Sequence, residues 1–452
     1  MSRFTRRDFL STTCRTMAAG AAAASFNRFG LINALAQGTA DYKALVCIFL
    51  FGGNDANNMI VPYSASDYAN YAQVRANLAL DQGTLLPIQP KSLSSPYSLH
   101  HRLTGVQQLF NDSKVAAVLN TGTLVQPTTR NQYLNAQVTV PQNLFSHDDQ
   151  QQQMQTATLN SFAEQGWGGK VADRVQAIYG GSFPVMISLA GVNVFAEGLV
   201  ARPIQTSGDP TKSLSGFSGS SEDQARLAAL QSLLTFDTGL TLIQSASSTT
   251  SNAIHDAKTL ADALALGSGI KTKFPKSPLG AQLAEVAKII QVRAALGLSR
   301  QIFFVSSGGF DTHSSQLKLQ DKLLLDLNGC MSAFYQATVE LGIPQQVTTF
   351  TLSDFSRTFL PDSTSGSDHA WGSHYLVMGD SVAGGDFYGT FPTLALGGPD
   401  DATSEGRWIP TISLDQYGAT LAQWFGVPAG DLPSVFPNLG NFTNKNLGFF
   451  GA

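Results

Sequence analysis

The stretch that decides the fold is Ala44-Leu-Val-Cys-Ile-Phe-Leu-Phe51, an unbroken apolar run followed at once by Gly52-Gly53-Asn54-Asp55. Short apolar runs without polar alternation, closed by glycine, are typical of strands that are buried on both faces, as in a parallel sheet. Three further stretches share this form and end in polar or glycine-rich turns: residues 115–119, 301–305 and 347–352. We therefore expect a buried, mainly parallel sheet.

Helical patterns lie between these strands. Apolar residues recur with a spacing near 3.6 over residues 281–298, and similar segments follow at 317–341 and 417–425. Strands that alternate with helices predict an α/β fold, with a mainly parallel sheet flanked by helices. We expect residues 41–452 to form a single domain, with a helical and loop insertion at 205–275, where Ser, Thr, Ala and Gly are frequent.

The composition excludes several classes of protein. Of 452 residues, 43% are hydrophobic and 13% are charged, which excludes a disordered chain. No apolar run reaches the roughly 18 residues that a membrane helix needs, so we expect no membrane span in the mature chain. Lys and Arg form no cluster beyond the N-terminus, which argues against nucleic acid as a partner.

The N-terminal 36 residues have the features of an export signal. Arg6 and Arg7 are followed by Phe9-Leu10, then by an Ala-rich stretch at 17–26 and a small-x-small site that ends at Ala36. This order predicts a twin-arginine signal peptide over residues 1–36, with the twin-arginine translocase as a partner and a periplasmic or secreted location. The alternative is a basic amphipathic helix. Cleavage after residue 36 would change the net charge from −4 to −8, since the segment holds five Arg and one Asp.

Candidate functional residues follow the predicted strands. Asp55, Asp311 with His313, and Asp354 come directly after three of them, and the carboxyl ends of parallel strands share one edge of a sheet. Asp368 and His369 lie in a glycine-bounded segment at 366–374. Carboxylates and neutral imidazoles suit Zn²⁺ or another first-row metal. The alternatives are an Asx turn at 311–313 and a polar surface loop at 366–374.

Ser146 precedes a helix-like run, where a serine is an ordinary N-cap. A hydroxyl at a helix N-terminus also lies near partial positive charge, which suits an anionic substrate. The chain has no Gly-x-Ser-x-Gly elbow, Walker loop, C-x-x-C or H-E-x-x-H motif. His100 and His101 form a pair that we expect to be solvated or structural.

A set of motifs resembles a known family. In order they are Thr5-Arg-Arg-Asp-Phe-Leu10, Phe49-Leu-Phe-Gly-Gly-Asn-Asp-Ala56, Gln126-Pro-Thr-Thr129, Phe145-Ser-His147, Gly166-Trp-Gly-Gly169, Gly309-Phe-Asp-Thr-His313, Ser353-Asp-Phe-Ser-Arg-Thr358, Asp368-His369 and Gly384-Gly385. The order resembles the family called domain of unknown function 1501, over nearly the whole mature chain. That family is similar in fold to the alkaline phosphatase/sulfatase superfamily, which places two metals at the carboxyl edge of its sheet.

The resemblance implies roles for individual residues. Asp55 resembles the first-strand metal ligand, and Ser146 occupies the place of the superfamily nucleophile. Asp311 with His313, Asp354 and His369 resemble further metal ligands. Phe355 follows Asp354 where the superfamily has histidine, so one metal site is expected to be incomplete.

Two functions follow from this resemblance. The first is an exported, metal-dependent hydrolase of phosphate or sulfate esters, in which Ser146 attacks an anionic small-molecule or polymer substrate. One or two divalent ions (Zn, Mn or Ca) would be held by Asp55, Asp311, His313, Asp354, Asp368 and His369. Arg357 would balance substrate charge, or form a salt bridge with Asp354. The alternative function is a non-catalytic periplasmic binding or assembly protein on a degenerate alkaline phosphatase-like fold.

Overall fold

The computed structural model describes residues 41–159, 162–205, 219–236 and 239–451. The expected signal peptide at 1–36 therefore lies outside the described residues. Within these ranges, no helix combines the length and the apolar character that crossing a membrane requires.

The centre of the molecule is a sheet built around β1 (Lys43–Leu50), which pairs in parallel with β8 (Arg300–Ser307) on one side and β9 (Val347–Ser353) on the other. The strand order is β11-β5-β10-β9-β1-β8-β6-β7, and β12 also pairs with β5. The remaining bounds are β5 (Val115–Gly122), β6 (Met186–Ser188), β7 (Ile204–Gln205), β10 (Ser373–Met378), β11 (Phe387–Tyr388) and β12 (Ile412–Ser413). The prediction of a mainly parallel sheet is confirmed.

One strand runs against the others, and this places the site. β10 is antiparallel to both β5 and β9, whereas the other described pairs in this sheet are parallel. An antiparallel strand begins at the edge where its parallel neighbours end. Residues just before β10 therefore lie beside those that follow β1, β8 and β9.

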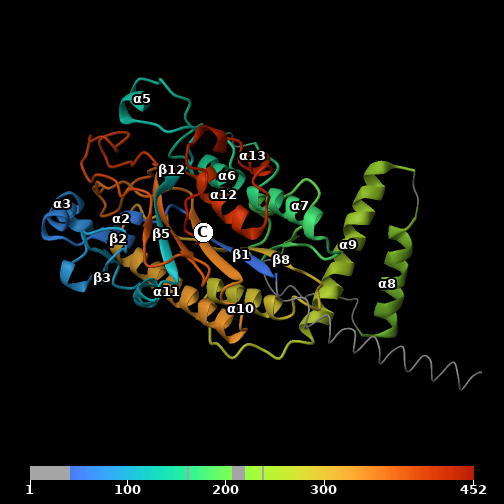
Figure 1. The fold of residues 1–452 in the computed structure, drawn as a ribbon. Helices are drawn as coiled ribbons and strands as arrows, with labels where there is room; N and C mark the ends of the chain where they lie inside the picture. The colour runs from blue at the N-terminus through green and yellow to red at the C-terminus, as the bar shows by residue number, and fades with distance from the viewer. Residues whose placement is uncertain (1–40, 160–161, 206–218, 237–238, 452) are drawn as a thin grey trace, which may run out of the picture.

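Helices cover both faces of the sheet (Figure 1). One face carries α4 (Thr104–Asn111), α10 (Pro278–Gln291) and α11 (Gln316–Glu340); the other carries α6 (His147–Thr156), α7 (Trp167–Tyr179) and α12 (Leu414–Phe425). Leu283, Val286 and Ile290 of α10 are fully buried, as the helical spacing predicts. The predicted α/β class with flanking helices is thus confirmed.

The chain after β1 forms a second, smaller sheet. It has the antiparallel order β2 (Ile60–Pro62), β4 (Tyr97–Leu99), β3 (Leu86–Ile88). The short helix α2 (Ala56–Met59) leads into it, and α3 (Ala65–Arg75) follows β2. Two further short helices are α5 (Arg130–Leu134) and α13 (Leu432–Val435).

Two helices stand apart from the sheet layers, α8 (Ser221–Leu234) and α9 (Thr241–Leu264) (Figure 1). They pack against each other, and α8 contains no buried residue among those described. The described part of the stretch at 205–275 is thus largely helical. The assignment of a single domain with an insertion stays a prediction.

Candidate metal centre

Three imidazoles and one carboxylate converge at the carboxyl edge of the sheet. His313 Nε2 lies 2.9 Å from Asp311 Oδ1, and His147 Nε2 and His369 Nε2 each lie 3.4 Å from the same oxygen. His313 Nε2 and His369 Nε2 are 2.9 Å apart. His147 is the first residue of α6, Asp311 and His313 follow β8, and His369 precedes β10. Three separate parts of the sequence thus bring ligand atoms together, in two overlapping groups: His147, Asp311 and His369, and His313, Asp368 and His369.

The ring of His147 is held by Asp354. Nδ1 of His147 lies 2.7 Å from Asp354 Oδ2, and Asp354 is buried directly after β9. The hydrogen bond to this carboxylate is the main cause that raises the pKa of His147. A neutral imidazole that donates from Nδ1 carries its lone pair on Nε2. His147 Nε2 is enclosed and has no well-aligned hydrogen-bond partner among the described residues. When the ring is neutral, its lone pair faces Asp311 Oδ1 at 3.4 Å.

His369 is oriented in the same way by a backbone carbonyl. Its Nδ1 lies 2.7 Å from the carbonyl oxygen of Phe145, which only an N–H can satisfy, so Nε2 again carries the lone pair. Burial lowers the pKa of His369 and favours this neutral form. Phe355 stacks on the ring at 4.8 Å between centroids. The aromatic residue at the expected histidine position therefore packs against a candidate ligand.

Arg357 fixes the carboxylate of the cluster. Its guanidinium is buried and donates from Nη1 to Asp311 Oδ1 at 2.7 Å, and it also donates to the carbonyl oxygens of Gly52 and Ser367. Burial tends to raise the pKa of Asp311. The hydrogen bond and the charge of Arg357 together lower it by more than burial raises it, so the pKa lies below its usual value. The alternative prediction, a salt bridge between Arg357 and Asp354, is wrong, because Arg357 forms its ion pair with Asp311.

Asp55 belongs to a different network. Its Oδ2 forms a buried ion pair with Arg75 Nη2 and accepts Gln316 Nε2 at 2.6 Å. Arg75 also donates to the carbonyl oxygens of Thr358 and Phe359, at 3.0 and 3.1 Å. The positive partner of Asp55 is therefore an arginine. Asp354 likewise orients His147 and accepts Gln151 Nε2 at 2.7 Å, so the contacts of these two expected ligands are those of supporting residues.

Ser146 makes the contacts of a helix cap. Its Oγ accepts the amide of Asp149 at 3.5 Å and donates to Asp149 Oδ2 at 2.6 Å. The residue of this turn that reaches the cluster is His147. Sequence reasoning missed it, because the segment was interpreted only through its serine. The signal that the sequence offered was the motif Phe145-Ser-His147, which is one of those that carry the family resemblance.

Two other residues of the 366–374 segment differ in their surroundings. Asp368 Oδ2 pairs with Arg407 Nη2 at 2.9 Å, although the carboxylate also lies close to His313 and His369. His374 is buried in β10, where its Nδ1 accepts the amide of Asn120 at 3.0 Å. Asp368 is thus at the rim of the cluster, and His374 is part of the sheet.

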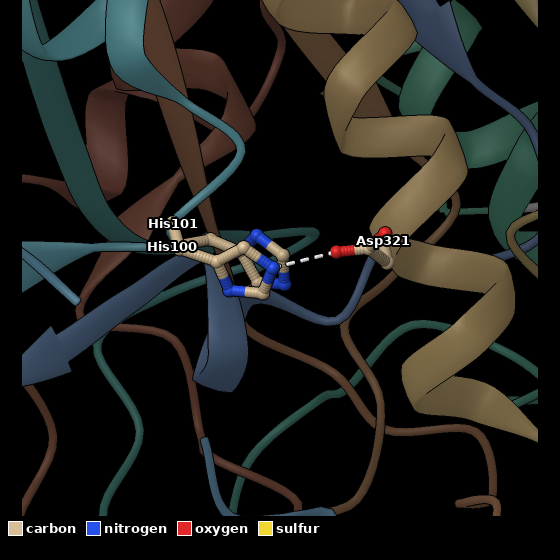
Figure 2. A group of neighbouring side chains, drawn as sticks. All are labelled: His100, His101 and Asp321. Atoms are coloured by element: carbon tan, nitrogen blue, oxygen red, sulfur yellow. Dashed lines mark hydrogen bonds and ion pairs between the residues drawn. The ribbon is translucent and has the colours of Figure 1, made fainter. Parts of the chain in front are cut away.

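A second histidine group lies before α4 (Figure 2). The rings of His100 and His101 stack with centroids 4.3 Å apart, and His101 Nε2 lies 2.7 Å from Asp321 Oδ1. Arg102 Nε donates to the same oxygen at 2.7 Å. The guanidinium already supplies the positive charge next to this carboxylate, so the contacts favour the structural role, in which the turn is tied to α11.

Comparison with known proteins places the chain in a family. The profile of DUF1501, a "protein of unknown function" family, matches residues 42–405. The chain belongs to the DUF1501 family. The resemblance seen in the sequence is thereby confirmed. No curated protein matches the chain in sequence.

Three solved structures are similar to this DUF1501 protein. Ps i-CgsB in complex with k-i-k-neocarrahexaose has 8% identity, with 88% of this chain and 77% of that chain covered and a TM-score of 0.37. The sulfatase PsFucS1 from Pseudoalteromonas sp. has 8% identity, with 89% and 71% covered and a TM-score of 0.37. A mutant of the alkaline phosphatase PafA has 13% identity, with 70% and 64% covered and a TM-score of 0.24. A sulfatase and an alkaline phosphatase are thus among the similar structures.

Proposed function

We propose that this DUF1501 protein is a metal-dependent hydrolase of phosphate or sulfate esters that binds one divalent ion through His147, Asp311, His313 and His369. The observation that carries the proposal is the convergence of three Nε2 atoms and Asp311 Oδ1. His147 and His369 both have Nδ1 engaged, so their lone pairs face each other and the carboxylate. Such a set of electron-pair donors is unfavourable without a cation or a proton between its members, and therefore fits a bound metal.

The chemistry of the donor set narrows the choice of ion. Three imidazole nitrogens and one carboxylate are suited to Zn²⁺ or Mn²⁺, whereas Ca²⁺ takes mainly oxygen ligands. Such an ion, when bound, polarises an ester oxygen and lowers the pKa of a water molecule.

The chain's own residues prepare the site. Asp354 keeps the proton of His147 on Nδ1, and the Phe145 carbonyl does the same for His369. Arg357 keeps Asp311 ionised and directs Oδ1 at the imidazoles. The role of Ser146 as nucleophile is not needed in this proposal, because its hydroxyl is engaged with Asp149.

We propose a single ion for a specific reason. The carboxylate of Asp55 is neutralised by Arg75 and also accepts Gln316. The oxygens of Asp354 accept the amide of Gly52 and the side chains of His147 and Gln151. Asp354 and the Oδ2 atom of Asp55 are thus engaged by protein donors, which a second ion would have to displace, whereas Asp55 Oδ1 is enclosed and has no hydrogen-bond partner among the described residues.

The alternative is a non-catalytic periplasmic binding or assembly protein. It is favoured by Phe355, whose ring packs on His369 in place of an additional ligand. A combined test separates the two functions: metal analysis of the purified protein, then hydrolysis of aryl phosphate and aryl sulfate esters with and without a chelator. We expect one ion per chain and chelator-sensitive hydrolysis. One ion without turnover would support the binding protein, and failure to bind Zn²⁺ or Mn²⁺ would overturn the metal centre.

We also propose that the protein is exported by the twin-arginine pathway. The support is the order Arg6-Arg7, Phe9-Leu10 and Ala34-Leu35-Ala36 at the N-terminus. This route carries folded cargo, so the ion would be bound before export.

A further inference from the structure

A buried side-chain amide joins two polar networks at the carboxyl edge of the sheet. Gln316 is the first residue of α11 and is fully buried. Its Nε2 donates to Asp55 Oδ2 at 2.6 Å, and its Oε1 accepts the hydroxyl of Ser367 at 2.5 Å. Ser367 is also fully buried. Gln316 thus connects the network of Asp55 to the segment that precedes β10.

Ser367 in turn accepts hydrogen bonds from Arg357. Nη2 of Arg357 donates to the carbonyl oxygen of Ser367, and Nε lies 3.4 Å from Ser367 Oγ. The same guanidinium donates from Nη1 to Asp311 Oδ1 at 2.7 Å. A continuous line of hydrogen bonds therefore runs from Gln316 through Ser367 and Arg357 to a candidate metal ligand.

The partners fix the direction of these hydrogen bonds. The carboxylate of Asp55, which is paired with Arg75, can only accept, so the amide of Gln316 presents Nε2 to Asp55 and Oε1 to Ser367. The Ser367 hydroxyl then donates to Gln316, which leaves the lone pairs of its oxygen to accept Arg357 Nε. Hydrogen bonds that run in one direction polarise and strengthen one another.

Packing alone does not explain a glutamine at this position. A fully buried amide is unfavourable unless its donor and its acceptor are both engaged, whereas an apolar side chain has no such requirement. Both side-chain hydrogen bonds of Gln316 go to distant segments, 261 and 51 positions away in the sequence. The specific effect of the amide is therefore to fix Ser367 relative to Asp55.

We propose that Gln316 is a positioning residue for the metal centre: through Ser367 it holds Arg357 against Asp311, so that Asp311 Oδ1 keeps its place beside the imidazoles. The effect on metal affinity rests on the proposed function, but the hold on Arg357 can be measured in metal-free protein. Neither Asp55 nor Ser367 is a proposed ligand. Gln316 should therefore affect the affinity and geometry of the ion, and leave the number of ions bound at saturation unchanged.

The test uses two variants of this line and one matched control. Gln316→Met keeps a long unbranched side chain and removes both amide functions, and Ser367→Ala removes the intervening hydroxyl and continues the test if the first variant does not fold. The control is Gln301→Met. Gln301 is equally buried and accepts the Tyr42 hydroxyl at 2.6 Å, but it lies at the start of β8, away from the carboxyl edge.

Two properties of the metal-loaded protein are measured: the affinity for Zn²⁺ by competition with a chelator, and the visible absorption spectrum of bound Co²⁺, which reports coordination geometry. We expect Gln316→Met and Ser367→Ala each to bind Zn²⁺ about tenfold more weakly, with an altered Co²⁺ spectrum. The double variant should lose no more than either single variant, because both changes interrupt the same line. Gln301→Met should match the unaltered protein in both measurements.

The metal-free protein supplies an independent measurement. Hydrogen exchange at Arg357 Nε–H, followed by NMR with isotope-labelled arginine, should be about tenfold faster in Gln316→Met than in Gln301→Met. Unchanged Zn²⁺ affinity and unchanged exchange at Arg357 in Gln316→Met would overturn the proposal, as would equal losses in Gln301→Met. If the unaltered protein binds no metal and exchange is still faster in Gln316→Met alone, the metal centre is wrong and the hold of Gln316 on Arg357 is supported.

Discussion

Asp354 Oδ2 lies 2.7 Å from His147 Nδ1, and this hydrogen bond joins the end of β9 to the first turn of α6. Because Nδ1–H of His147 donates to this carboxylate, the remaining nitrogen, Nε2, faces Asp311 Oδ1 at 3.4 Å. In the proposed site, Asp354, which the resemblance presents as a metal ligand, orients the ligand His147 through this hydrogen bond. Pairs of carboxylate and histidine of this kind orient metal ligands and raise their basicity.

The first prediction concerns this pair. Asp354→Asn removes the negative charge that holds the His147 ring, while nearly preserving the shape of the side chain. We expect the affinity for Zn²⁺ to fall by roughly 10–100-fold, measured by competition with a chelator. Asp321→Asn is the control, because Asp321 is bound to His101 and Arg102. Equal Zn²⁺ affinity in Asp354→Asn and the unaltered protein would contradict the supporting role.

The second prediction separates Asp55 from the metal centre. Asp55→Ala leaves the guanidinium of Arg75 buried without its carboxylate, and losing one partner of a buried pair costs about 3–5 kcal/mol. We expect a loss of this size in the free energy of unfolding, measured with urea, and an unchanged content of one ion per folded chain. The double variant Asp55→Ala with Arg75→Met should recover part of the loss. A variant that stays stable but loses an ion would show that Asp55 is a ligand.

The third prediction distinguishes the two roles of Ser146. Ser146→Ala removes both the hydroxyl and the cap, whereas Ser146→Asn removes the hydroxyl and keeps an N-cap side chain. We expect Ser146→Ala to lose about 1 kcal/mol of stability and Ser146→Asn to lose less. Hydrolysis of the aryl esters should be retained in Ser146→Asn, because Ser146 Oγ is engaged by Asp149. A loss of several orders of magnitude in rate in both variants would instead establish a covalent role.

The sequence predicted the position of candidate ligands where carboxylate or imidazole side chains lie at the end of a predicted strand. Asp311, His313 and His369 could be found because each lies in a polar or glycine-rich segment beside a buried strand, and the parallel order brings such segments together. Asp55 met the same criterion, yet its carboxylate turns to Arg75. Whether a carboxylate faces an ion or a guanidinium depends on what packs against it. Arg75 comes from α3, and no local pattern links that helix to β1.

His147 was missed for a related reason. Its ring reaches the cluster only because the N-terminus of α6 packs beside the end of β9, a contact between segments about 200 positions apart that carries no local pattern. In the sequence, the serine before it has an ordinary capping role, which the structure bears out in its contacts. Ser146, the capping residue, and His147, the residue at the cluster, are adjacent in the sequence. Because capping serines are common at helix starts, the segment was interpreted through Ser146 alone.

The fourth prediction concerns export. Replacing Arg6 and Arg7 by Lys keeps the positive charge but removes the arginine pair that identifies the twin-arginine signal. We expect precursor to accumulate in the cytoplasm, detected by fractionation and immunoblotting. Lys substitution at Arg3 and Arg15, outside the pair, is the control. Mature protein in the periplasm at the usual level would contradict the twin-arginine assignment.

The last prediction concerns His374, which is structural and lies outside the proposed ligand set. Burial lowers its pKa from 6.5 to about 3 in the folded protein, where its Nδ1 accepts the amide of Asn120. Above pH 6.5 the ring is neutral in both the folded and the unfolded chain, so it adds no pH dependence there. As the pH falls from 6.5 towards 3, only the unfolded chain takes up the proton. The free energy of unfolding should therefore fall by about 1.4 kcal/mol per pH unit from this residue.

His374→Asn isolates this effect, because an asparagine Oδ1 can occupy the place of the ring Nδ1 and accept the Asn120 amide. The substitution lowers the free energy of unfolding by some amount at pH 7.5. At pH 5 this difference between the unaltered protein and the variant should be smaller by about 2 kcal/mol, since the variant no longer gains this proton on unfolding. Urea denaturation at the two pH values measures both gaps. His100 has its pKa lowered to about 3 chiefly by burial, and it remains in both proteins, so its contribution cancels. A gap that is the same at the two pH values would show that His374 does not resist protonation in the fold.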